Sequence, residues 1–301
     1  MKFFRLSHRN EIRVGLVRGE SEGVLLPAQH SDVVDVIEGG KDALAAAKKL
    51  LDARDAETIS LAGTRLLSPI GRFRRDVLCT GWNYWDHFEE GIGRREGQEV
   101  ERPTAPTFFT RSPSTVIGPT DPIAFDTGIS KKWDYEAEIV AVFGKTGRSI
   151  PHSEAMDHVF GYCLANDVSQ RDLQRRHGGQ WLKGKSIDKT MPIGPWIVTA
   201  DEIDLPKVRL QCVLNGEIMQ DKTADLMAFP LTELIAELSF GMTVNAGEIL
   251  LTGTPAGVGN ARTPPVFLNE GDRVEILGSG LGALTNIMTK QDLLGRSDIV
   301  I

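Results

Sequence analysis

The chain has 301 residues, of which 41% are hydrophobic and 25% are charged, and this composition is ordinary for a soluble globular protein of one large domain, or of one large and one small domain. The net charge of −7 argues against nucleic acid as the main partner, and no apolar run is long enough to cross a membrane. Because the three cysteines form no C-x-x-C motif and the first residues lack the apolar core of a signal peptide, we expect a cytoplasmic protein.

The first quarter of the chain, residues 1–75, is predicted to form a small N-terminal α/β unit. Alternating apolar residues indicate strands, and Ser31 and Asp32 can cap a short helix. An Ala- and Leu-rich segment follows as a second helix, and a segment with Pro69 and Gly71 ends the unit as a linker. The pattern predicts strands over residues 12–17 and 24–26, helices over 33–37 and 42–51, and a linker over 66–75.

The rest of the chain, residues 76–301, consists of short apolar runs separated by Gly, Pro and Asn, and is predicted to be a second, larger domain. Many short strands with few helices favour an α+β or mostly-β roll over a doubly wound sheet. Residues 208–219 predict a hairpin, because Asn215-Gly216 separates two strand-like runs. Residues 91–102 are charged, contain glycine and lack periodicity, so we expect a mobile loop there.

Two glutamates stand at the start of a buried strand. Glu136 and Glu138 lead into the β-branched run 139–143, and side chains two residues apart on a strand share a face. Because the run beyond Glu138 is apolar on both faces, we expect the strand to be buried. A second apolar run, 159–164, leads to Asp167, whose carboxylate is a candidate third member of the group.

Buried carboxylates that share a face repel each other and lose hydration. They persist only if they are protonated, paired with a cation or bound to a metal. One interpretation is that both glutamates pair with Arg or Lys. The other is a metal site, since three carboxylates without His or Cys suit a hard cation such as Mg²⁺, Mn²⁺ or Ca²⁺.

A histidine and a glutamate lie three residues apart in a segment that can form a helical turn. One turn would bring His87 and Glu90 together. A carboxylate beside an imidazole fixes its tautomer and makes it a better base. The alternative is a surface histidine that happens to lie among acidic residues.

Residues 179–186 match the P-loop pattern G-x-x-x-x-G-K-S, but we expect no nucleotide site there. A P-loop lies between a buried strand and a helix, whereas this segment follows a polar run and precedes Pro192 and Pro195, which break any helix. Lys185 within it could balance the three carboxylates or could be an exposed lysine. The Gly-rich loop 252–259 could present backbone N–H groups to an anion or could be a plain turn.

Taken in order, these motifs resemble the fumarylacetoacetate hydrolase (FAH) family, in particular its acylpyruvase-like and 2-hydroxyhepta-2,4-diene-1,7-dioate isomerase-like members. The motifs that carry the resemblance are 81–87, 114–119, 134–138, 161–172, 179–186, 251–259, 271–272 and 280–286. The set of Glu136, Glu138 and Asp167 is the most specific part. The resemblance implies a mixed β-roll of the FAH C-terminal-domain type behind the N-terminal unit, with a metal-bound active site, usually in a homodimer.

The resemblance also implies roles for single residues. Glu136, Glu138 and Asp167 would be the metal ligands, for Mg²⁺ or Mn²⁺, with Ca²⁺ as a further option. The remaining assignments are His87 and Glu90 as a water-activating dyad, Lys185 as the active-site lysine, and Arg111, Arg171, Gln174, Gly253 and Thr254 as substrate contacts. Two features depart from the family pattern: Arg111 stands where many relatives have lysine, and the loop 91–102 is longer than expected.

The implied chemistry is hydrolysis of a C–C bond in a 2,4-dioxo acid, of the acylpyruvate or fumarylpyruvate type. His87 would take a proton from water, the hydroxide would attack the 4-carbonyl, and the C3–C4 bond would break to leave a metal-bound enolate near Lys185. The alternative is a decarboxylase, isomerase or hydratase acting on 2-oxo acids such as oxaloacetate or 2-hydroxydienoates. A non-catalytic domain that binds a metal and a small anion is a third interpretation, and it would not need His87, Glu90 and Lys185 together.

Overall fold

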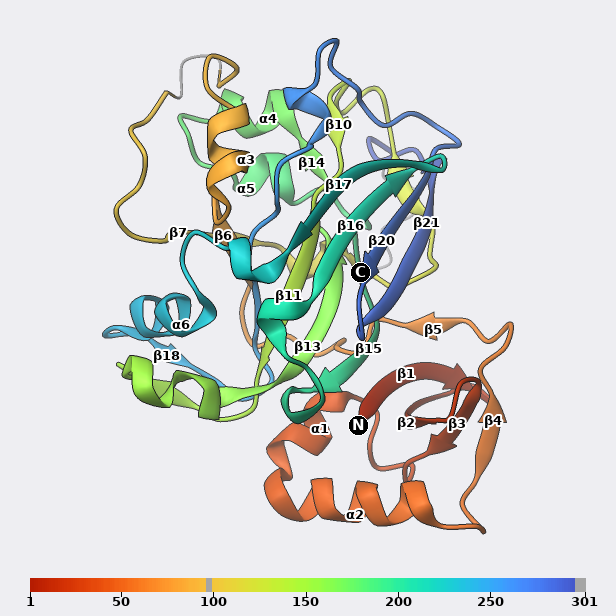
Figure 1. Ribbon diagram of the computed structural model, residues 1–301. Coiled ribbons are helices and arrows are strands. Elements are labelled where there is room, and N and C mark those ends of the chain that lie inside the picture. Colours follow the sequence, from red (N-terminus) through yellow and green to blue (C-terminus); the bar gives the residue numbers. More distant parts are fainter. Residues whose placement is uncertain (96–98, 296–301) are drawn as a thin grey trace.

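The computed structural model describes residues 1–95 and 99–295, so residues 96–98 of the predicted loop 91–102 lie outside the described residues. Within the described residues, the largest sheet has 12 strands and the next has five. The first strands and helices form one end of the molecule, and α3, α4 and α5 lie at the opposite end (Figure 1). Strands outnumber helices, so the predicted α+β class is confirmed and a doubly wound sheet is excluded.

The large sheet runs through the whole molecule. In spatial order its main path is β4 (Thr58–Ser60), β3 (Glu22–Leu25), β2 (Glu11–Arg18), β1 (Lys2–His8), β15 (Met191–Thr199), β13 (Val159–Asn166), β11 (Ala137–Phe143), β19 (Ile249–Leu251), β6 (Val77–Gly81) and β7 (Thr107–Arg111). Beside this path, β5 (Leu66–Leu67) pairs with β1, and β8 (Val116–Ile117) pairs with β15. Two short ladders pair β10 (Trp133–Asp134) with β14 (Ser169–Gln170) and β12 (Gly147–Arg148) with β18 (Thr243–Val244).

The smaller sheet contains the predicted hairpin. Its order is β17 (Glu217–Thr223), β16 (Arg209–Leu214), β20 (Arg273–Gly278), β21 (Gly282–Lys290) and β9 (Ile123–Phe125). Asn215 and Gly216 connect β16 to β17 with φ values of 53° and 89°. Two successive residues with positive φ are the mark of the type I′ turn that an Asn-Gly pair favours, so the hairpin prediction is confirmed.

The helices are short and lie outside the sheets. They are α1 (Val33–Glu38), α2 (Gly40–Asp52), α3 (Trp85–Glu90), α4 (Arg171–Arg176), α5 (Leu182–Lys185) and α6 (Leu231–Ser239). Asp32 is the N-cap of α1, where its side chain accepts a hydrogen bond from the Val34 N–H at 3.0 Å. A 3₁₀ helix, His152–His158, precedes β13.

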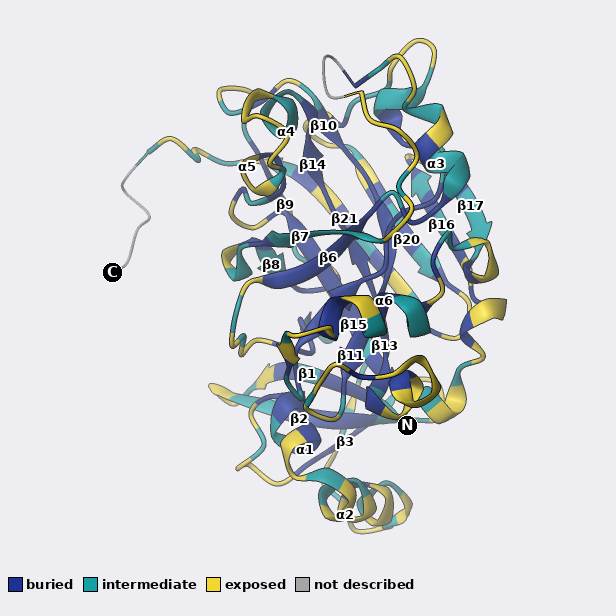
Figure 2. Ribbon diagram, turned by 90° about the vertical axis from the view of Figure 1, so that its left-hand side faces the viewer, coloured by how far each residue is buried: buried dark blue, intermediate teal, exposed yellow. Residues whose placement is uncertain are grey.

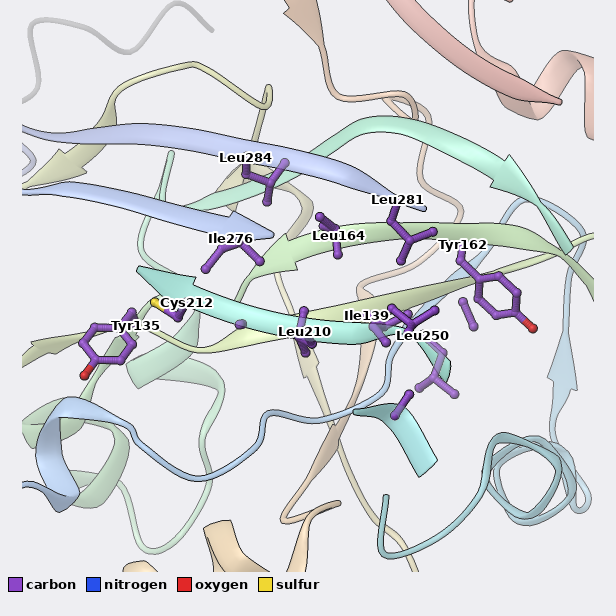
Figure 3. Close-up of a cluster of buried hydrophobic side chains, with 14 of the residues drawn as sticks. Tyr135, Ile139, Tyr162, Leu164, Leu210, Cys212, Leu250, Ile276, Leu281 and Leu284 are labelled. Carbon is purple, nitrogen blue, oxygen red and sulfur yellow. The ribbon is translucent and has the colours of Figure 1, made fainter. Parts of the chain in front are cut away.

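β11 buries both of its faces, as its apolar sequence predicts. Ile139 faces the smaller sheet, where it joins a cluster that includes Leu210 (Figure 3). Val140, the next residue, belongs to a second cluster on the other face, together with Val33 of α1. Burying each such side chain contributes about 1.5–3 kcal/mol, and the packing on two sides holds β11 and β13 in a fixed register. Most strands of the large sheet are accordingly buried (Figure 2).

The N-terminal unit is joined to the larger domain through the large sheet. β1 pairs antiparallel with β15, with Lys2 opposite Val198 and Phe3 opposite Ile197. The sequence patterns predict neither of these two strands. The division of the chain at residue 75 stays a prediction, since the sheet continues across it.

Candidate active site

The antiparallel pairing of β11 and β13 brings three carboxylates together. Ala137 lies opposite Asn166, so Glu136 at the start of one strand lies beside Asp167 at the end of the other, and the Asp167 N–H donates to the Glu136 carbonyl at 2.8 Å. Glu138 shares the face of Glu136, and a carboxylate oxygen from each of the three residues lies within 4.8 Å of the others. All three side chains are buried.

Two of the three carboxylates are paired with buried cations. Lys185 Nζ donates to Glu136 Oε2 at 2.6 Å and to Asp167 Oδ2 at 2.8 Å. The second oxygen of Glu136 lies 2.7 Å from Arg171 Nη2, and the second oxygen of Asp167 accepts from Arg111 Nη1. The sequence left open, as an alternative, that both glutamates pair with Arg or Lys. Glu136 is paired in this way, whereas Glu138 has no such partner among the described residues.

Glu138 accepts a hydrogen bond from the Gly253 N–H at 2.8 Å, and among the described residues it forms no ion pair. Burial, together with the charges of Asp167 and Glu136, raises its pKa well above the ordinary value. Glu136 behaves differently. Burial raises its pKa, but Lys185 and Arg171 outweigh that effect and bring the pKa to about 2. Among the described residues, Glu138 is therefore the carboxylate of the cluster that has no cationic partner.

A hard divalent cation fits this donor set. The cluster offers carboxylate oxygens from Glu136, Glu138 and Asp167 and no sulfur or imidazole donor, which is the ligand chemistry of Mg²⁺ and Mn²⁺, and of Ca²⁺. The uncompensated carboxylate of Glu138 supplies the charge that such an ion would balance. The assignment of these residues as metal ligands stays a prediction.

α3 carries the pair of His87 and Glu90. His87 Nδ1 and Glu90 Oε1 lie 2.7 Å apart, and Glu90 Oε2 accepts from the Gly257 N–H at 2.7 Å. Donation from Nδ1 to the carboxylate leaves the lone pair of Nε2 available as a base. Both residues line the same cavity as Glu136 and Glu138, so the pair is not a surface feature.

The Gly-rich loop that follows β19 directs its N–H groups to carboxylates of the protein. Gly253 donates to Glu138, Gly257 to Glu90, and Gly259 to Asp134 at 2.8 Å. The sequence left open whether this loop binds an anion or is a plain turn; among the described residues, its N–H groups donate to these anionic side chains. The loop therefore positions both the carboxylate cluster and the His87–Glu90 pair.

The cavity has a volume of about 90 Å³. Of the predicted substrate contacts, Arg171, Gln174 and Thr254 line it. Arg111 and Gly253 do not, because they lie behind Asp167 and Glu138 and hold those carboxylates in place. The predicted substrate roles of these two residues are thus not supported by where they lie.

Several residues of the site are not predicted from the sequence. Asp134 is buried and accepts from Arg171 Nε at 2.8 Å, so it orients the guanidinium that reaches Glu136. It belongs to the same motif as the two glutamates, and its spacing two residues before Glu136 was the available signal. Other lining residues without a sequence prediction are Trp82, Arg94, Arg95, Phe109, Arg175 and Trp181.

The segment that matches the P-loop pattern does not have P-loop geometry. It is preceded by α4 and not by a strand, and it contains only the short α5 before β15 begins at Met191. Lys185, at the end of α5, is buried against Glu136 and Asp167. The alternative that Lys185 is an exposed lysine is therefore excluded.

Comparison with known proteins agrees with this geometry. Residues 76–289 match the family model described as fumarylacetoacetate (FAA) hydrolase, C-terminal. The chain belongs to the fumarylacetoacetate hydrolase family. The family predicted from the sequence motifs is therefore confirmed, and the site described above is the carboxylate-lined site of a member of this enzyme family.

Several curated relatives of this family member are named as oxaloacetate tautomerases. It is 42% identical over 241 residues to oxaloacetate tautomerase YisK of Bacillus subtilis, covering 80% of this chain and 78% of that one. It is 39% identical over 289 residues to the mitochondrial oxaloacetate tautomerase Fahd2a of Rattus norvegicus, covering 94% and 89%. The solved fumarylacetoacetate hydrolase of Exiguobacterium antarcticum superposes with a TM-score of 0.82 at 35% identity, covering 97% of this chain and all of that one (100%). The predicted hydrolase activity is not confirmed by these matches.

No helix in the described part of the chain is long and apolar enough to cross a membrane.

Replacing Glu138 with glutamine should weaken Mn²⁺ binding by more than about 100-fold. The change removes the one carboxylate of the cluster without a cationic partner, and losing a ligand should cost more than the 10- to 100-fold typical of an outer-sphere partner. Titration calorimetry on metal-free protein measures the affinity. Glu237→Gln, an exposed glutamate on α6, is the matched control. Equal Mn²⁺ affinity in the two variants would overturn the ligand assignment.

Because of Glu138, the metal-free protein should become less stable as the pH rises. The pKa of Glu138 is raised in the folded state, whereas a glutamate in the unfolded chain ionises near about 4.3. Above that pH the unfolded state binds fewer protons than the folded state, so the free energy of unfolding falls with increasing pH. Urea unfolding of chelator-treated protein at roughly pH 5 to 8 measures this slope. Glu138→Gln should flatten it and Glu237→Gln should not; equal slopes in all three proteins would contradict the assignment.

Proposed function

We propose that this enzyme interconverts the keto and enol forms of oxaloacetate or of a closely similar 2-oxo dicarboxylate. The observation that carries the proposal is the placement of the His87–Glu90 pair, suited to moving a proton, in one small cavity with Glu136, Glu138 and Lys185. The names of the curated relatives support the same reaction. Tautomerisation is an isomerisation, which the sequence left as an alternative to its main prediction of a C–C hydrolase.

Tautomerisation moves one proton between C3 and the 2-oxo oxygen of the substrate. When bound by Glu136, Glu138 and Asp167, a divalent cation supplies Lewis-acid polarisation of a 2-oxo acid. His87, with Nδ1 held by Glu90, presents Nε2 as the base that takes the proton at one of the two positions and returns it at the other. The Lys185 ammonium balances negative charge that develops on the substrate oxygen.

The size of the cavity favours a small substrate. Pockets for drug-sized ligands have volumes of about 300–1,000 Å³, whereas this one has about 90 Å³. Water-dependent cleavage also requires a 4-carbonyl carbon that hydroxide can attack, and oxaloacetate has a carboxylate at that position. With oxaloacetate, the His87–Glu90 pair therefore has no acyl group to hydrolyse, and it transfers a proton of the substrate.

Three further parts of the proposal rest on family membership and on the donor set. We propose Mg²⁺ or Mn²⁺ as the physiological ion, with Ca²⁺ as a weaker candidate. We also propose a homodimer and a cytoplasmic location, as the sequence predicts.

The proposal predicts that Mg²⁺-loaded protein accelerates loss of the enol absorbance of oxaloacetate, and that His87→Gln lowers this rate by about 100-fold or more. Glu90→Gln should cost less, because it removes only the group that orients the ring. His152→Gln, at an exposed histidine, is the control. Mn²⁺ affinity should be unchanged in all three variants, which separates loss of the base from loss of the metal.

Other outcomes of the same assay point to other reactions. Enol loss no faster than with Mg²⁺ alone would reject the tautomerase. Pyruvate release in proportion to oxaloacetate consumed would indicate a decarboxylase. Cleavage of an acylpyruvate at a rate that His87→Gln abolishes would restore the hydrolase interpretation.

A further inference from the structure

Arg94 lies in the turn that follows α3 and lines the cavity together with Glu136, Glu138 and Lys185. It is half-buried, and its guanidinium is held by the loop around the 3₁₀ turn Gly259–Ala261. Nη1 donates to the Arg262 carbonyl at 2.6 Å and more weakly to the Asn260 carbonyl at 3.4 Å. Nη2 donates to Thr263 Oγ1 at 2.7 Å.

These acceptors are all neutral. No carboxylate of the described residues forms an ion pair with Arg94, so its positive charge is not compensated within that part of the chain. The guanidinium has five N–H donors, and the bonds above leave the Nε–H and one Nη2–H without an acceptor among the described residues. In a guanidinium, the Nε–H and the Nη2–H beside it form one edge, and this edge can bind both oxygens of a carboxylate.

The other cations of the cavity wall have partners. Lys185 and Arg171 are paired with carboxylates of the cluster. Arg95 lies over the ring of Phe88, at 4.0 Å from its centroid, and 3.8 Å from a carboxylate oxygen of Glu99. Arg175 also has an interaction partner. Among the described residues that line the cavity, Arg94 is thus the arginine with N–H donors left over and only neutral acceptors.

We propose that Arg94 binds the distal carboxylate of the substrate and so selects 2-oxo dicarboxylates over 2-oxo monocarboxylates. The inference rests on the proposed function, and it takes the 2-oxo acid end of the substrate to lie at the cation that Glu136, Glu138 and Asp167 would hold. A four-carbon substrate then carries a second carboxylate away from that cluster. A negative charge in so small a cavity requires a cationic partner, and Arg94 offers one without breaking an existing ion pair.

A purely structural role for Arg94 predicts something different. In that case its bonds to residues 260–263 only hold the turn after α3 in place, and removing them would weaken every ligand alike. Recognition of the distal carboxylate weakens dicarboxylates selectively. The two roles are therefore separated by a pair of ligands that differ at this one group.

Malate and 2-hydroxybutyrate form such a pair, because a methyl group in one replaces the distal carboxylate of the other. Both are stable, and both carry the 2-oxygen and first carboxylate required at the cluster. Titration calorimetry of the Mg²⁺-loaded protein with each ligand gives an affinity ratio for wild type, Arg94→Gln and Arg94→Lys. Arg102→Gln is the matched control. Arg102 belongs to the same segment as Arg94, residues 91–102, but it lies over the Trp85 ring, 3.7 Å from its centroid, and does not line the cavity.

We expect wild type to prefer malate. Arg94→Gln should lower malate affinity by about 10- to 100-fold, the range for losing one charge-assisted contact. The affinity for 2-hydroxybutyrate should stay the same. Arg94→Lys should keep part of the preference, and Arg102→Gln all of it. Equal losses for both ligands in Arg94→Gln, or no preference in wild type, would overturn the proposal. If Arg94→Gln fails to fold, a smaller malate preference in Arg94→Lys with unchanged 2-hydroxybutyrate affinity supports the proposal, and an unchanged preference or equal losses for both ligands reject it.

These binding measurements do not depend on turnover. Selective loss of malate binding together with no acceleration of enol loss would reject the tautomerase and keep the carboxylate subsite. Normal tautomerase activity together with unchanged malate preference in Arg94→Gln would keep the reaction and reject the subsite.

Discussion

In the part of the chain that the structure describes, four carboxylates and three cations are buried together where β11 begins and β13 ends, and the rest of the site depends on how their charges are balanced. The residues are Asp134, Glu136, Glu138, Asp167, Arg111, Arg171 and Lys185. Removing charged groups from water costs several kcal/mol for each ion, and close pairs with further hydrogen bonds are needed to offset that cost. Three cations cannot neutralise four carboxylates, and the raised pKa of Glu138, due to burial and then to its charged neighbours, identifies the carboxylate that is left over. A divalent cation would remove that imbalance.

The Gly-rich loop links this charge cluster to the His87–Glu90 pair. Its backbone donates to Glu138 through Gly253 and to Glu90 through Gly257. Both glycines have positive φ, 97° and 111°, and a Cβ atom on Gly257 would lie 2.1 Å from the Met219 carbonyl oxygen. Only glycine fits such positions without strain. A single loop conformation therefore sets the distance between the carboxylates and the histidine.

The sequence predicts the parts of this arrangement that depend on local pattern. The period of two along a buried strand places Glu136 and Glu138 on one face, and Asn215-Gly216 specifies its hairpin. β15 is not predicted, because Pro192, Gly194 and Pro195 are unfavourable in a strand by local rules, and the pairing with β1 and β13 overrides them. Residues whose role arises from distant contacts are missed for the same reason. Arg94 meets the carbonyl of a residue 168 positions away, and no spacing in the sequence encodes that contact.

The two functions that we assign to the segment around α3 are coupled by its attachment. Glu90 and Arg94 both bond to the stretch 257–263, one through a backbone N–H and the other through backbone carbonyls and a hydroxyl. The base and the cation for the distal carboxylate are therefore fixed to one surface, and a displacement of that surface moves both. On this proposal, a substrate with a charge at each end would contact the cluster and this segment at once, whereas a monocarboxylate would contact the cluster alone. Binding energy from the distal carboxylate would thus be used to hold His87 over the reacting carbon, which links specificity for dicarboxylates to the rate of proton transfer.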